Sequence, residues 1–301
     1  MPERSSAPES GVVIVDKPPG WTSHQVVGRL RRVLGTRRVG HAGTLDPMAT
    51  GVLLVGVGRA TRLLGHLALT DKSYLATIRL GQATVTDDAE GELVATHDAS
   101  GLTELAVVAA VGRYHGTISQ VPSAVSAIKV NGQRAYARVR RGEDVILAGR
   151  TVHISRFDVT GFRRVLMADG ACVDVDVEID CSSGTYVRAL ARDVGRDLGV
   201  GGHLTRLRRT RVGSFTLDLP HAAPVDLEQD DRPIPLISML DVARRCFPVV
   251  VVDDAAARDI GVGRPLSLPV PANPSAMVHG DALIALYRPA DEGSAPVAVL
   301  V

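Results

Sequence analysis

The stretch GHAGTLDPMATG, residues 40–51, places one carboxylate, that of Asp46, in a glycine-rich loop. An amphipathic helix capped by Thr22 or Ser23 is expected before this loop, and an apolar strand over 52–57 is expected after it. Pro47 biases Asp46 toward an extended backbone, and the glycines permit close approach or unusual dihedral angles. Such a loop is typical either of a plain turn or of a carboxylate held rigidly for chemistry.

Hydrophobic patterns outside this loop predict further strands and helices. Strands are expected at 11–16, 72–80, 173–179 and 203–215, and helices at 60–67, 102–111 and 185–198. A proline-rich stretch at 220–235 predicts a linker. Beyond it, a strand at 248–252, a helix at 255–260 and strands at 276–287 and 296–301 indicate a small β-rich module.

The composition is that of an ordinary globular protein, because 45% of the residues are hydrophobic and 22% are charged. The 301 residues suffice for about two domains. No apolar run approaches the roughly 20 residues that span a bilayer, and residues 1–10 are expected to form a disordered tail. Three cysteines without a CxxC pair favour buried thiols in a reducing, cytoplasmic location.

The net charge of +1 hides an uneven distribution. Residues 1–66 carry nine Lys or Arg against four Asp or Glu, and residues 122–215 carry sixteen against ten. The segments 67–121 and 216–301 are acidic instead. Two basic blocks fit a surface that binds a polyanion, although a mixed solvated surface explains the charges equally well.

Motifs for several other chemistries are missing from the sequence. It holds no HExxH, no CxxC and no calcium-binding loop, so metal dependence is not expected. A nucleotide cofactor is not expected either, because GxGxxG and Walker A motifs are absent, and the GxSxG elbow of serine hydrolases is absent as well. The acidic residues that alternate through 174–180 predict a solvated strand face rather than a metal site.

Five segments together resemble the successive motifs of the bacterial tRNA pseudouridine-55 synthases, the TruB family. In chain order they are GVVIVDKPPGWTS (11–23), GHAGTLDPMATGVLLVGVGRATR (40–62), DKSYLATIRLGQATVTDDAEG (71–91), SAIKVNGQRAYARVRRGE (126–143) and CSSGTYVRALARDVGRDLGVGGHLTRLRRTRVGSF (181–215). The resemblance implies an α+β fold, in which a mixed, mostly antiparallel sheet is flanked by helices. It implies a catalytic domain over 11–245 and a PUA-like RNA-binding module over 246–301.

The resemblance also implies roles for individual residues. Asp46 would be the catalytic nucleophile, Tyr74 would stack on the target uridine, and Arg188 would pair with the Asp46 carboxylate. Leu207 would contact the base from its apolar side. The remaining implied site residues are His41, which would hold the splayed T-loop, and Lys17, which would support the loop around the site.

A mobile thumb that closes on the RNA would match residues 122–150, and its Arg138, Arg140 and Arg141 would contact phosphate. The family usually reads Gln-x-Pro-Pro before this segment, whereas here residues 120–123 read QVPS and lack the second proline. The implied partner is the T-arm of tRNA, bound by a monomer that needs no metal and no nucleotide cofactor.

Uridine isomerisation is compatible with these residues. The reaction breaks the C1′–N1 bond and forms C1′–C5 without net redox change or hydrolysis. A carboxylate can act as nucleophile at C6 or at C1′, and the sequence does not choose between them. The target base must be flipped out and held by stacking. The alternatives are a non-catalytic tRNA-binding factor and, less favoured, a glycosidase-like enzyme, which would need a second carboxylate.

Overall fold

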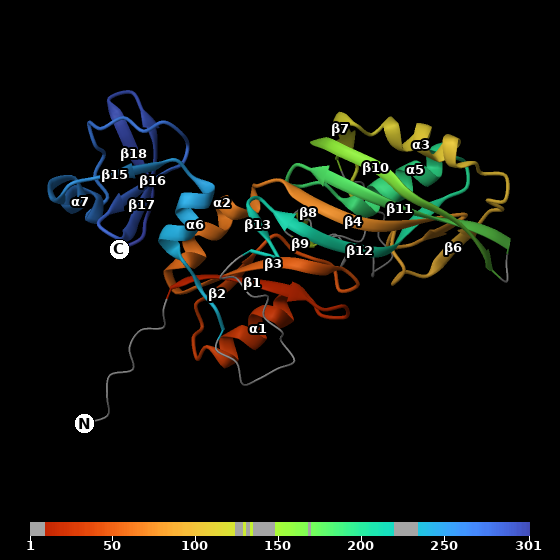
Figure 1. Ribbon diagram of the computed structural model, residues 1–301, viewed down its shortest axis with the longest axis horizontal. Helices are drawn as coiled ribbons and strands as arrows, with labels where there is room; N and C mark the ends of the chain where they lie inside the picture. Colours follow the sequence, from red (N-terminus) through yellow and green to blue (C-terminus); the bar gives the residue numbers. More distant parts are fainter. Residues whose placement is uncertain (1–9, 124–128, 131–132, 135–147, 168–169, 220–233) are drawn as a thin grey trace. The chain divides into compact units, whose positions relative to one another are not determined.

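The computed structural model describes residues 10–123, 129–130, 133–134, 148–167, 170–219 and 234–301 (Figure 1). Contacts within the chain divide it into two compact units. The first unit comprises residues 1–46, 51–68 and 212–301, and the second comprises residues 47–50 and 69–211.

One part of the first unit is an antiparallel sheet with helices packed on it. Strand β1 (Gly11–Lys17) lies between β14 (Ile237–Ser238) and β3 (Thr50–Val57), and β2 (Val39–Ala42) also pairs with β3. The other elements are α1 (Ser23–Val33), the 3₁₀ helix η1 (Gly58–Leu63), α2 (Leu64–Ala68), β13 (Phe215–Thr216) and α6 (Met239–Cys246). The predicted strands at 11–16 and 52–57 are confirmed. The helix expected at 60–67 begins as the 3₁₀ helix η1. The glycine-rich loop at residues 40–51 begins inside β2.

Helix α1 forms where its sequence predicts it. Thr22 is the N-cap: its hydroxyl accepts from the Gln25 N–H at 3.1 Å, and the Gln25 side chain accepts from the Thr22 N–H at 2.7 Å, which makes a capping box. The apolar residues Val26, Val27 and Leu30 are buried. The basic residues of α1 are consequently left on the outward side.

The C-terminal module is rich in strands, as predicted. Its four-stranded sheet has the order β15 (Val249–Val251), β16 (Ser275–His279), β17 (Ala282–Ala290) and β18 (Gly293–Val299), and helix α7 (Asp254–Gly261) follows β15. Only the β15–β16 pair is parallel. The prediction of a single strand over residues 276–287 is wrong, because Gly280 (φ 55°) turns the chain and separates β16 from β17.

One apolar cluster of the first unit contains residues from both ends of the chain. Val12 and Leu54 of the N-terminal sheet belong to the same buried cluster as Ala276 and Leu286 of the C-terminal module. Arg59 also donates to the carbonyl oxygen of Leu300 at 3.4 Å. Shared burial of this kind stabilises both sheets at once.

In the described residues of the second unit, five neighbouring strands of one sheet are accompanied by the helices α3 and α5. The sheet has the order β12 (Gly202–Val212), β4 (Lys72–Leu80), β11 (Gly170–Cys181), β10 (Arg150–Met167) and β7 (Gly116–Gln120). Helix α3 (Glu104–Gly112) packs on β10, and α5 (Val187–Asp197) packs on β4 and on α3 (Figure 1). The short strands are β5 (Gln82–Thr84), β6 (Leu93–Thr96), β8 (Lys129–Val130) and β9 (Gln133–Arg134). The predicted α+β fold with a mixed, mostly antiparallel sheet is confirmed.

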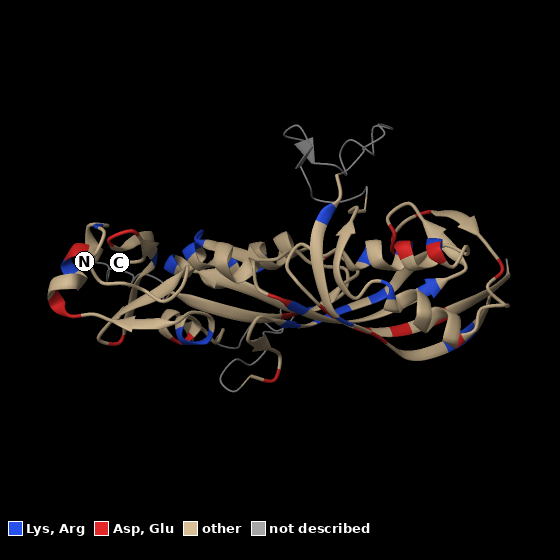
Figure 2. Cartoon of the chain, turned by 90° about the horizontal axis from the view of Figure 1, so that it is seen from above, with Lys and Arg blue, Asp and Glu red and all other residues tan. Residues whose placement is uncertain are grey.

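The acidic residues of β11 are paired across the sheet. Asp174 lies opposite Arg79 of β4 and accepts from its Nε at 2.8 Å, and Asp176 accepts from Thr77 at 2.7 Å. Asp176 also pairs with Arg163 of β10. Figure 2 shows acidic and basic positions interspersed along the strands of the chain. The predicted alternation is correct, but cross-strand partners, rather than water alone, satisfy the carboxylates.

Two glycines let α5 approach β12 closely. A Cβ atom on Gly195 would lie 2.3 Å from the backbone of Gly201 and Gly202, and one on Gly202 would lie 2.5 Å from the Ala191 carbonyl oxygen. No side chain can be accommodated between these backbones without moving them. The contact therefore fixes the helix on the strand.

We predict that Gly195→Ala destabilises the protein by about 2 kcal/mol, because overpacking outweighs the higher helix propensity of alanine. Thermal unfolding followed by circular dichroism would measure the change. Gly112→Ala is the matched control, since a Cβ atom on this glycine of α3 meets nothing within 4 Å. Equal stability of the two variants would show that the close approach is not a constraint.

Candidate active site

The loop that carries Asp46 is attached to the first turn of α1. The buried Ser23 hydroxyl accepts from the Leu45 N–H at 2.9 Å and donates to the Leu45 carbonyl oxygen at 3.1 Å. Gly43 (φ 80°) and Gly51 (φ 98°) take up the left-handed conformations that the sequence suggested. Leu45 is buried, whereas its neighbour Asp46 is partly exposed. The backbone immediately before the Asp46 carboxylate is therefore held to α1.

His41 and Lys17 lie in the same unit. The imidazole of His41 meets that of His24 edge to face, with ring centroids 5.5 Å apart. Lys17 is fully buried, and its ammonium donates to the carbonyl oxygens of Trp21 at 2.6 Å and Pro18 at 2.9 Å. Lys17 thus holds the turn between β1 and α1.

Tyr74 and Leu207 lie on neighbouring strands of the second unit. Tyr74 on β4 is 7% exposed and Leu207 on β12 is 6% exposed. Lys72, two residues before Tyr74, is also buried, and burial together with the positive charge of Arg209 lowers its pKa to about 8. An aromatic ring and an aliphatic side chain, both almost fully buried, thus lie on adjacent strands.

Arg188, at the start of α5, is held by the loop after β5. Its Nη1 donates to the Thr86 carbonyl oxygen at 2.8 Å and lies 3.4 Å from Asp88 Oδ2, and both charged side chains are almost fully buried. A buried guanidinium is stable only with such partners. The expected pairing of Arg188 with Asp46 joins residues of different units and stays a prediction.

A second acidic side chain lies beside this pair. Asp87 has a left-handed backbone (φ 59°), and its Oδ2 is 3.3 Å from Arg192 Nη1. Burial raises the pKa of Asp87, and the Ser123 hydroxyl, Arg192 and Arg188 act in the opposite direction. Ser123 is fully buried and stands where the family has its second proline, so this departure places a hydroxyl next to Asp87.

The start of α5 is positioned by a buried amide. Gln120 is 2% exposed; its Oε1 accepts from the Tyr186 N–H at 2.8 Å and its Nε2 donates to the Tyr186 carbonyl oxygen at 3.0 Å. Tyr186 is the N-cap of α5 and has no side-chain cap, so Gln120 fixes the turn from which Arg188 extends. Sequence reasoning missed Ser23, Asp88 and Gln120 as supporting residues, although all three lie in or beside the quoted motifs.

The structure thus places the expected site residues in two groups. Lys17, His41 and Asp46 belong to the first unit, and Tyr74, Arg188 and Leu207 belong to the second. The thumb arginines Arg138, Arg140 and Arg141 lie outside the described residues. Within the described part of the chain, no cluster of three or more His, Cys, Asp or Glu side chains could hold a metal ion, and no helix is long and apolar enough to span a bilayer.

Known proteins resemble this chain over most of its length. The chain is 61% identical to tRNA pseudouridine synthase B of Cutibacterium acnes over 94% of its own length and 95% of that protein. It is 56% identical to tRNA pseudouridine synthase B of Thermobifida fusca over 96% of its length and 98% of that protein. Among solved structures, a chain of the archaeal box H/ACA sRNP Nop10–Cbf5 complex superposes with a TM-score of 0.69. That match covers 99% of this chain and 89% of the other at 24% identity, and it shows likeness of fold.

Two family profiles match adjoining parts of the chain. The profile described as TruB family pseudouridylate synthase (N terminal domain) matches residues 31–187, and the tRNA pseudouridylate synthase B C-terminal domain matches residues 188–229. The first match alone spans Asp46 and Tyr74 and ends one residue before Arg188. The motifs, the fold and these matches agree, and the chain belongs to the TruB family of pseudouridylate synthases.

Proposed function

We propose that the protein isomerises uridine to pseudouridine at position 55 in the T-loop of tRNA. The observation that carries the proposal is the agreement, over almost the whole chain, with proteins named tRNA pseudouridine synthase B. The aspartate loop held by Ser23 and the buried Arg188 support it. The enzyme is an isomerase, because the uracil base is detached from C1′ at N1 and reattached to the same carbon through C5.

Each half of the site has a task in the reaction. The Asp46 carboxylate adds to C6 of the uracil ring or to C1′ of the ribose, the C1′–N1 bond breaks, and the ring turns so that C5 bonds to C1′. The hydrogen on C5 is then lost to water, N1 gains a proton, and the carboxylate is released. Tyr74 stacks on the flipped base and Leu207 covers its other side, and such stacking contributes about 1–3 kcal/mol per base.

Arg188 keeps the nucleophile ionised in this account. A guanidinium carries five N–H donors, enough to serve Asp88, Thr86 and a further carboxylate. A nearby positive charge favours the charged form of an aspartate when water is excluded. Asp88 contacts Arg188, so we assign it as a positioning residue that orients the guanidinium toward Asp46.

Other features follow from the same proposal. The catalytic domain spans residues 11–245 and the PUA-like RNA-binding module spans 246–301, and the enzyme acts as a monomer in the cytoplasm. The T-arm is bound with help from His41 and from the thumb at 122–150. Lys17 supports the site indirectly through the turn at Pro18 and Trp21.

We predict that Asp46→Asn abolishes tritium release from C5-labelled uridine in a T-arm stem-loop, because a carboxamide is a poor nucleophile. RNA affinity, measured by filter binding, should stay within about threefold of the wild type, as stacking and phosphate contacts remain. Asp291 is exposed in the turn after β17, so Asp291→Asn is the control for an effect of removing any one carboxylate. Undiminished release by Asp46→Asn would refute the nucleophile. A wild type that binds tRNA but never releases tritium would favour the non-catalytic tRNA-binding alternative.

We predict that Asp88→Asn lowers kcat by at least about tenfold and leaves KM nearly unchanged, because Arg188 loses its charged partner but the RNA-binding surface is intact. Single-turnover tritium release would measure the effect. Asp174→Asn, which breaks the Arg79 pair on the same sheet, is the matched control and should leave kcat unchanged. A parallel fall in both variants would point to a general loss of stability instead.

We predict that replacing Arg138, Arg140 and Arg141 together by alanine weakens RNA binding and flattens its salt dependence. Each lost phosphate contact should reduce the slope of log K against log salt concentration by roughly 0.7–0.9. Binding titrations between low and physiological salt would give both slopes. An unchanged slope would mean that these arginines do not contact phosphate.

A further inference from the structure

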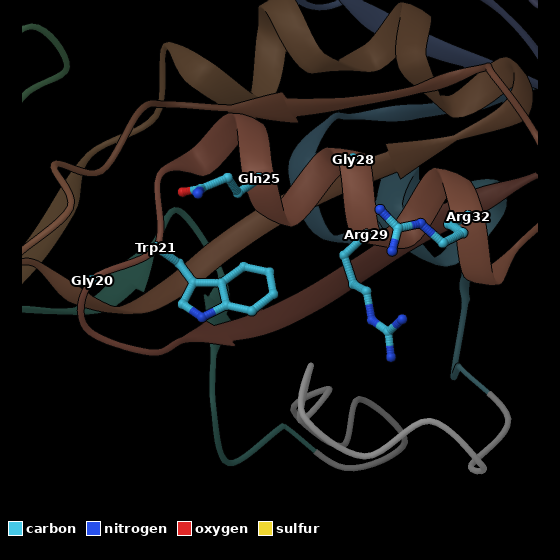
Figure 3. Close-up of a pocket in the computed structure, with 6 residues that line it drawn as sticks. All are labelled: Gly20, Trp21, Gln25, Gly28, Arg29 and Arg32. Atoms are coloured by element: carbon cyan, nitrogen blue, oxygen red, sulfur yellow. The ribbon is translucent and has the colours of Figure 1, made fainter.

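A pocket of about 420 Å³ lies on helix α1, and the proposed reaction does not use it. It is lined by Gly20, Trp21, Gln25, Gly28, Arg29 and Arg32 (Figure 3). The volume falls in the range of pockets that bind small organic groups. All six residues come from one continuous stretch of the first unit, so the pocket is a local feature of that unit.

One end of the pocket is a flat aromatic surface. Trp21 is the only tryptophan of the chain, and its indole lies alongside α1 below Gln25 (Figure 3). The buried Lys17 ammonium holds the Trp21 carbonyl oxygen at 2.6 Å, and the capping box of Thr22 fixes the next residue. The indole therefore extends from a backbone that is already ordered.

The other end of the pocket is basic. Arg29 and Arg32 are three residues apart on α1 and lie beside each other in Figure 3. The segment 21–38 contains five arginines, counting Arg38, and no acidic residue. This stretch of sequence therefore carries a net positive charge, which attracts anions.

Open space separates the two ends. Gly28 lies on the helix between the indole and the arginines, and a Cβ atom built on it would meet nothing within 4 Å. An indole face for stacking, a gap and a pair of guanidinium groups match the base, sugar and phosphate of one nucleotide. Stacking on tryptophan and arginine contacts to phosphate are the usual means of binding single-stranded RNA.

We propose that this pocket binds one nucleotide of the substrate RNA outside the reacting loop, with its base on Trp21 and its phosphate between Arg29 and Arg32. The proposal rests on the proposed function. Ser23 anchors the Asp46 loop to α1, and Arg29 and Arg32 lie about 9 and 14 Å further along the helix at 1.5 Å per residue. One RNA molecule can span this distance. Arg37 and Arg38, which follow α1 in the chain, are exposed and add to the positive charge of this segment, which favours a polyanion such as RNA over a free mononucleotide.

The single tryptophan makes the pocket directly observable. A T-arm stem-loop carrying its natural flanking nucleotides should quench the Trp21 fluorescence saturably as its base stacks on the indole. Gly28→Glu places a carboxylate in the gap without a steric clash. Gly28→Glu should abolish the quenching and raise the KM for RNA about tenfold, with kcat unchanged. A tenfold change is at the low end of the affinity that is lost when one base no longer stacks. Arg32→Ala should change KM in the same direction.

Gly65→Glu is the matched control, because Gly65 is another exposed helical glycine of the first unit whose Cβ would meet nothing within 4 Å. It should behave as the wild type, and equal unfolding temperatures would show that all variants are folded. Normal tritium release by the wild type, combined with a normal KM for Gly28→Glu and Arg32→Ala, would overturn the pocket assignment and leave the proposed function standing. Absence of release by the wild type would overturn the function itself. Equally strong quenching by adenosine 5′-monophosphate, with the KM for RNA unaffected by Gly28→Glu, would identify a free-nucleotide site and overturn the RNA assignment.

Discussion

The buried hydroxyl of Ser23 joins the two elements on which the first unit's share of the site depends. By accepting from and donating to the backbone of Leu45, it fixes the residue before Asp46 to the first turn of α1. The same turn is ordered from the other side by Lys17, whose ammonium needs carbonyl partners because it is fully buried. One short segment, residues 17–25, thereby orders the aspartate loop, the start of α1 and the backbone of Trp21.

Buried charge plays the corresponding role in the second unit. Arg188 is almost inaccessible to water, so its guanidinium has to be satisfied by the protein, and Asp88 and Thr86 supply partners. Gln120 fixes the turn before Arg188, and Gly195 and Gly202 fix the helix behind it. The direction in which this guanidinium points is thus set by groups that need never touch a substrate.

The sequence predicted the regular elements well, because periodicity and capping depend on neighbouring residues. Thr22, the alternation through β4 and β11 and the stripe on α1 all have local causes. The hairpin at Gly280 was missed: the polar residues His279 and Asp281 on either side of this glycine interrupt the apolar pattern, but the prediction joined the two apolar runs across them into one strand. Asp88 and Gln120 could not be given tasks from the sequence, as their partners Arg188 and Tyr186 lie 100 and 66 positions away in the chain. The roles of Asp46, Tyr74 and Leu207 came from the family resemblance and remain proposals.

The contact between α5 and β12 also has a consequence for evolution. Gly195 and Gly202 lie so close to the backbone of the opposite element that neither position can take a side chain. Selection would therefore retain both glycines in any descendant that keeps this packing. In an alignment they would be as invariant as a nucleophile, although neither carries a functional group. Invariance would then mark a demand of shape, and only the geometry of the helix and strand separates such positions from those that do chemistry.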